Sequence, residues 1–216
     1  MIESIHIIYK HLLTTGTLDV SVFRDHLISK GFREKTRVIE TPAGPLKEYL
    51  YLEPSSLQDL IVVSAKGWVV DSRSHRSALN LISLGYDLYE EAMGELASEI
   101  VANIVEIITA TIILHRSYED IISSLFSPVA IDVIRKNLNR TDIYPFAATL
   151  SMGVPKPPHE WVTISISPAP IPHRKNRINI QINYRSMDPD KGVLFVRNLP
   201  DFLENLGKAL EKIRRD

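Results

Sequence analysis

Two segments near the carboxyl terminus, residues 161–167 and 178–185, alternate between apolar and polar side chains. The first reads Trp-Val-Thr-Ile-Ser-Ile-Ser, and the second reads Ile-Asn-Ile-Gln-Ile-Asn-Tyr-Arg. Because successive side chains of a strand point to opposite faces of a sheet, this alternation predicts two β-strands, each with one apolar and one polar face. The pattern indicates an antiparallel sheet that packs on one side and is open on the other.

The first third of the chain is predicted to contain both helices and strands. Helices are expected over residues 2–14 and 18–30, the second opened by Asp19 and closed near Gly31. Four short strands are expected after them, at about 35–40, 46–53, 59–64 and 67–71. Proline and glycine residues between these strands favour tight turns.

Residues 74–139 carry no strand pattern, and three or four helices are expected there. Within them, Ser127 followed by Pro128 is typical of a helix start. The stretch 96–114 is rich in isoleucine and valine and is expected to be a helix that forms the core spine or a subunit interface. No membrane span is expected, because charged and amide side chains interrupt the apolar run. Glu106 is one of them, and it is expected on a solvated or ion-paired acidic stripe.

The carboxyl end is predicted to finish with strands and one helix. A strand-like segment covers 143–150, and a turn at 188–192 is expected to lead into a strand over 193–197. The last helix carries apolar residues at heptad spacing, Leu199, Leu203, Leu206, Leu210 and Ile213. We expect this helix to dock on the sheet, with a dimer-forming coiled coil as the alternative.

These patterns together predict an α+β protein, in which antiparallel strands from the N- and C-terminal thirds flank a helical middle segment. A single domain over residues 1–216 is expected. The alternative is a division into an α+β and helical part, 1–140, and a βββα part, 141–216.

Composition excludes several classes of chemistry. The chain has no cysteine, so thiol nucleophiles, disulfides and iron–sulfur clusters are absent. No two of the seven histidines stand four residues apart on an expected helix, and no glycine-rich phosphate-binding motif is present. We therefore expect neither a cofactor nor a metal site. Two glutamines against 26 isoleucines indicate a thermophile, and the lack of a signal peptide indicates a cytoplasmic protein.

The strongest candidate for a binding surface is a basic loop between the two alternating strands. Prolines at positions 168, 170 and 172 favour a stiff, extended backbone. Basic side chains follow them at His173, Arg174, Lys175 and Arg177. The polar strand face beside the loop carries Asn179, Gln181, Asn183 and Arg185, with Trp161 as a stacking surface.

We therefore expect a non-catalytic binding or assembly protein that contacts single-stranded nucleic acid through this loop and polar face. A homo-oligomer or a larger protein complex is the expected assembly. The alternative is an enzyme that acts on an anionic or phosphorylated substrate. In it, His75 is the acid or base, and Arg73 and Arg76 hold the substrate. Ser74 is equally well explained as a helix cap.

Overall fold

The computed structural model describes residues 1–42, 44–56, 58–98, 100–142, 144–152, 160–170 and 175–213. These residues form a nine-stranded antiparallel sheet and five α-helices, which confirms the α+β class. The strands are β1 (Ile2–Leu13), β2 (Arg33–Thr41), β3 (Gly44–Leu52), β4 (Leu60–Ser64), β5 (Gly67–Ser72), β6 (Ala102–Ile113), β7 (Ala148–Met152), β8 (Trp161–Pro168) and β9 (Arg177–Ser186). The helices are α1 (Val20–Ser29), α2 (His75–Met93), α3 (Tyr118–Ser124), α4 (Pro128–Leu138) and α5 (Pro189–Lys212), with a 3₁₀ turn, η1 (Gly94–Ser98).

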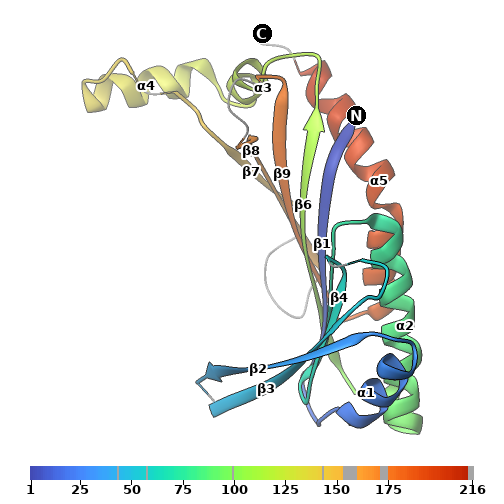
Figure 1. Cartoon of the computed structure of the whole chain (residues 1–216). Coiled ribbons are helices and arrows are strands. Elements are labelled where there is room, and N and C mark those ends of the chain that lie inside the picture. The colour runs from blue at the N-terminus through green and yellow to red at the C-terminus, as the bar shows by residue number, and fades with distance from the viewer. Residues whose placement is uncertain are drawn as a thin grey trace.

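All nine strands belong to one curved sheet in the order β2-β3-β4-β5-β1-β6-β9-β8-β7. Figure 1 shows α1, α2 and α5 against its convex face. On the concave side, β2 and β3 reach outward at one end, and β7, β8 and α4 reach outward at the other. The sheet therefore has one face covered by these helices and one face that they leave bare.

The chain passes through this sheet in two similar halves. In the first half, β1 is followed by α1, then by β2–β5, and then by the long helix α2. In the second half, β6 is followed by α3 and α4, then by β7–β9, and then by the long helix α5. The opening strand of each half pairs with its last strand, β1 with β5 and β6 with β9. The two opening strands also pair with each other, and this central pair joins the halves.

Both central strands were predicted to be helices, and both predictions are wrong. The predicted helix 2–14 is β1, and the predicted helix 96–114 contains η1 and β6. In β6 every second side chain, from Ala102 to Ile112, is buried, which is strand periodicity. The other face of β6 also carries aliphatic side chains, among them Val105 and Ile107, so apolar residues lie on both sides of the strand. An apolar run of this kind cannot be distinguished from a buried helix by periodicity.

Helix α5 also differs from prediction, because it begins before the segment 193–197 that was expected to be a strand. The Asp188 side chain caps it by accepting hydrogen bonds from the backbone N–H groups of Asp190 and Lys191. Pro189 then occupies the first turn, a position that proline favours. The heptad residues Leu199, Leu203 and Leu210 are buried within the chain, so the docked helix is confirmed and these leucines are not free to form a zipper.

Other predicted elements match more closely. Helix α1 is capped by Asp19 and α2 by Ser74, as expected, and the predicted helix after Ser127 is α4. The segment 143–150 contains the start of β7, although Ile143 lies outside the described residues. The single-domain prediction, with its alternative division after residue 140, stays a prediction.

Glu106 is buried in the core, contrary to the solvated stripe expected for it. It lies on β6 between Tyr9 of β1 and Tyr184 of β9. Neither carboxyl oxygen has a hydrogen-bond partner among the described residues, and burial raises the pKa of Glu106 to about 9. Helix α5 crosses above it at Gly192, where a Cβ atom would lie 3.1 Å from Glu106 Oε1. The side chain is therefore protonated at neutral pH.

We predict that Glu106→Gln removes a pH dependence of stability. The unfolded chain releases the Glu106 proton near pH 4.5, and the folded chain releases it near pH 9. The free energy of unfolding of the wild type is therefore highest below pH 4.5 and falls as the pH rises from 4.5 to about 9. A neutral amide has no such transition. Urea unfolding should show that the variant gains roughly 3–4 kcal/mol over wild type between pH 5 and pH 8.

Glu91→Gln, on the exposed side of α2, is the matched control and should follow wild type at both pH values. A Glu106→Gln variant whose stability relative to wild type is the same at pH 5 and pH 8 would contradict the burial of a protonated carboxyl.

Candidate nucleic-acid interface

The bare side of the sheet, called the open face below, consists of the side chains that point away from α1, α2 and α5. One cross-strand row runs over all nine strands: Ser151, Thr163, Asn183, Ile107, Ile8, Asp71, Leu60, Leu52 and Arg33. At roughly 4.8 Å per strand spacing, such a row follows the sheet for about 38 Å. The row is polar at the β7 end, aliphatic through its centre except for Asp71, and ends in Arg33 on β2.

The alternating residues of β9 lie as their pattern predicts. The isoleucines of β9 and Tyr184 are buried against the helices. Asn179, Gln181, Asn183 and Arg185 lie on the opposite, open face. The Asn183 side-chain amide donates to Thr163 Oγ1 across the strand pair at 3.4 Å. The strand thus presents amide groups toward the concave side.

Trp161 and Arg185 form a pair on the open face. They are cross-strand neighbours on β8 and β9, and the Arg185 guanidinium lies 5.3 Å from the centre of the Trp161 ring. A guanidinium over an aromatic ring is attracted to the ring face, and its N–H groups can still bind an anion. The structure therefore brings together two of the residues predicted to contact nucleic acid.

The basic loop is only partly described. His173 and Arg174 lie outside the described residues. The Lys175 side chain is exposed, while its carbonyl oxygen accepts a hydrogen bond from the Tyr118 N–H group. The Arg177 guanidinium is only 14% exposed and donates to Glu3 at 2.6 Å. Of the described loop cations, Lys175 is thus the one whose charge faces solvent.

Charge pairing on the open face leaves an excess of cations. Each of three carboxylates is matched by its own base: Glu3 by Arg177, Glu48 by Arg37 and Asp71 by His6. Four further cations make no ion pair with any described residue: Lys10, Arg33, Lys35 and Arg185. The described part of the open face therefore carries unpaired positive charge.

Sequence reasoning did not find Lys10, Arg33 or Lys35 as site residues. Lys10 lies in β1, which was predicted to be a helix, and the other two lie in β2. Lys10 and Lys35 share a cross-strand row with Arg185, through pairings between strands that are far apart in the sequence. The alternation Arg-Glu-Lys-Thr-Arg over 33–37 indicates that one face of this strand is basic. It does not indicate to which side of the sheet that face points.

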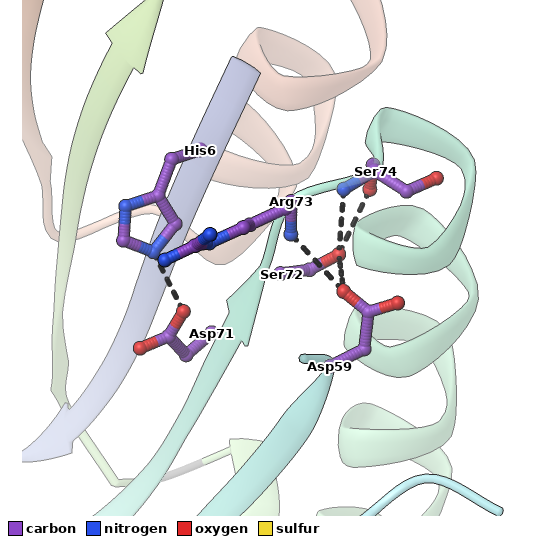
Figure 2. A network of polar contacts seen from close by, with 6 residues as sticks. All are labelled: His6, Asp59, Asp71, Ser72, Arg73 and Ser74. Carbon is purple, nitrogen blue, oxygen red and sulfur yellow. Dashed lines mark hydrogen bonds and ion pairs between the residues drawn. The ribbon is translucent and has the colours of Figure 1, made fainter. Parts of the chain in front are cut away.

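Asp59 organises the turn between β5 and α2. Figure 2 shows its carboxylate accepting hydrogen bonds from the Ser72 hydroxyl, at 2.6 Å, and from the Arg73 backbone N–H, at 3.0 Å. Burial raises the pKa of Asp59, but these hydrogen bonds outweigh it and hold the pKa below its usual value. In the same view the Arg73 side chain points toward His6 and Asp71, whose side chains lie 2.7 Å apart. The turn thus directs Arg73 to the rim of the open face.

The residues of the alternative enzyme hypothesis are placed at the start of α2. Ser74 caps this helix by accepting a hydrogen bond from the Ser77 N–H group. His75 Nε2 lies 2.8 Å from the Val196 carbonyl oxygen, and because a carbonyl only accepts, this nitrogen donates. Arg73 and Arg76 are exposed. His75 thus uses one ring nitrogen to tie α2 to α5.

The described residues contain no group of three or more His, Asp or Glu side chains placed to hold a metal ion. Within the same residues, no helix is both long enough and apolar enough to cross a membrane. Comparisons with protein-family models, with curated proteins and with solved structures give no match.

We predict that Asp59→Ala destabilises the fold by about 1–3 kcal/mol, because the Ser72 hydroxyl and the Arg73 N–H lose their acceptor in a largely buried turn. Asp71→Ala is the matched control, since its ion pair with His6 is more than a third exposed and such pairs contribute about 0–1 kcal/mol. Chemical denaturation measures the loss in the free energy of unfolding of each variant. Equal losses would show that the Asp59 network does not hold this turn.

Proposed function

We propose that this protein binds single-stranded nucleic acid, without catalysis, on the open face of its sheet. The observation that carries the proposal is a concave sheet face that α1, α2 and α5 leave bare. Among its described residues each carboxylate has a basic partner, and four cations make no ion pair. Phosphates dominate the affinity of proteins for nucleic acids, and unpaired Lys and Arg side chains are the groups that contact them.

Each part of the open face has a role in this proposal. Lys10, Arg33, Lys35 and Arg185 contact phosphates, and so does the exposed Lys175. The same role for His173 and Arg174, which lie outside the described residues, is proposed from the sequence alone. Asn179, Gln181 and Asn183 hydrogen-bond to the edges of unpaired bases, which a single strand leaves accessible. Trp161 offers a ring on which a base stacks.

The proposal includes an assembly of two or more copies of this chain. Helix α4 contributes no buried residue, and its apolar side chains are open, with Val129 72% and Leu138 62% exposed. Exposed apolar clusters of this kind mark interaction surfaces. The neighbouring strand β7 is an edge of the sheet, so its outer backbone groups are not paired within the described sheet. The cytoplasmic location stays a prediction from the sequence.

We predict that binding of a fluorescent single-stranded oligonucleotide weakens steeply with salt. Four phosphate contacts give a slope of about −3 for log K against log salt concentration. Replacing Lys10, Arg33, Lys35 and Arg185 together by Gln should flatten this slope toward zero. Fluorescence anisotropy at salt concentrations between about 50 and 200 mM measures the slope.

The control replaces four cations outside the open face by Gln: Lys30, Arg197, Lys208 and Lys212. It changes the net charge equally and should keep the wild-type slope. Equal weakening in both variants would contradict the proposed surface, as would binding of duplex in preference to single strands.

We predict that wild type is larger than one chain in solution and that Val129→Ser with Leu138→Ser reduces it to a monomer, because both side chains are exposed and apolar. Light scattering gives the mass directly. A monomeric wild type would exclude the assembly and leave the nucleic-acid proposal to its own test.

A further inference from the structure

A second candidate site lies on the helix-covered side of the sheet, away from the open face. It is a cavity of about 460 Å³ between the end of α2 and the first turn of α5, and it reaches inward to β1 and β6. Its lining includes His11, Tyr86, Tyr89, Glu90, Gly94 and Asp190. A cavity of this size is typical of small-molecule sites.

His11 forms the inner wall of this cavity and is 1% exposed. Neither of its ring nitrogens has a hydrogen-bond partner among the described residues. Burial lowers its pKa to about 4, so the ring is neutral and one nitrogen offers a lone pair. Buried polar groups are nearly always hydrogen-bonded, so the unpaired ring of a residue that lines a cavity indicates a partner within that cavity.

Aromatic rings surround His11. The centres of the Trp68, Tyr86 and Tyr89 rings lie 5.3, 5.3 and 4.6 Å from the centre of the His11 ring. The hydroxyls of both tyrosines are already used, because Tyr86 bonds to the Tyr9 hydroxyl and Tyr89 donates to the Ala97 carbonyl. The tyrosines also present ring surface to the cavity, and such surface attracts cations.

The charge of the cavity points in the same direction. Three acidic residues line it, Glu90, Glu95 and Asp190, and no Lys or Arg does. It also borders the C-terminal end of α2 at Gly94, where the helix dipole favours positive charge. No group of three His, Asp or Glu side chains among the described residues is placed to hold a metal ion, so the acidic lining favours an organic cation.

We propose that this cavity binds a small organic cation that carries an N–H donor, a primary or secondary alkylammonium. Its N–H group donates to the free nitrogen of His11, its alkyl part contacts the rings of Tyr86 and Tyr89, and Glu90 and Asp190 balance its charge. A quaternary ammonium satisfies the charge but leaves His11 unpaired. A neutral alcohol has a donor but lacks the charge.

The test titrates the wild-type protein with butylammonium, tetramethylammonium and 1-butanol, followed by NMR or calorimetry. Butylammonium should bind at least tenfold more tightly than either of the other two. If 1-butanol binds as tightly as butylammonium, the role of charge is wrong. If tetramethylammonium binds as tightly, the role of His11 is wrong. If butylammonium does not bind at about tens of millimolar, the affinity range of a very small ligand, the site itself is wrong.

Variants locate the binding. His11→Phe should lose butylammonium binding at least tenfold and remain folded, because an apolar ring replaces an unpaired polar one. Glu90→Gln with Asp190→Asn changes only exposed side chains and should weaken binding about tenfold. Glu91→Gln, one residue away and absent from the lining, should bind as wild type. If Glu91→Gln weakens butylammonium binding as much as the double variant Glu90→Gln with Asp190→Asn does, the proposal is wrong.

Discussion

The antiparallel pairing of β1 with β6 is the interaction on which the rest of the structure depends. It is the only contact between strands of the two halves in the described sheet, and it runs from Ile2 to Leu13 along β1. Each side of this pair supports a different candidate site. The inward side carries Tyr9, His11 and Glu106 beneath the helices, while the outward side carries Lys10 among aliphatic residues of the open face. A change in register by one residue would exchange the two sets.

The covered side of this pair holds two polar groups without partners, and their surroundings differ. Glu106 lies under Gly192, where the close approach of α5 leaves no room for a Cβ atom beside Ile104. It is sealed from solvent, so its consequence is a loss of stability as pH rises. His11 lines a cavity, and for this reason we propose that a ligand there supplies its missing partner. The same defect, an unpaired buried group, therefore leads to a stability prediction in one case and to a site in the other.

Much of this fold follows from local pattern, and the failures share one physical cause. Strands with one solvated face, such as β8 and β9, alternate in sequence and were predicted, as were α1, α2 and α4 from their caps. Strand β6 carries aliphatic side chains on both faces, and β1 has a buried histidine on its inward face and Ile8 on its outward face, so neither strand alternates cleanly and both were taken for helices. The polar side of β9 and the Trp161–Arg185 pair could be predicted. The basic end of the open face could not, because Lys10 and Lys35 meet Arg185 only through pairings across the whole sheet.

The most direct test of the account is lysine acetylation with and without a saturating single-stranded oligonucleotide, read by mass spectrometry. If nucleic acid lies on the open face, Lys10 and Lys35 become protected, while Lys30, Lys208 and Lys212 react as before. Protection of the second group, or unchanged reactivity of the first, would contradict the central claim that the bare concave face is the binding surface.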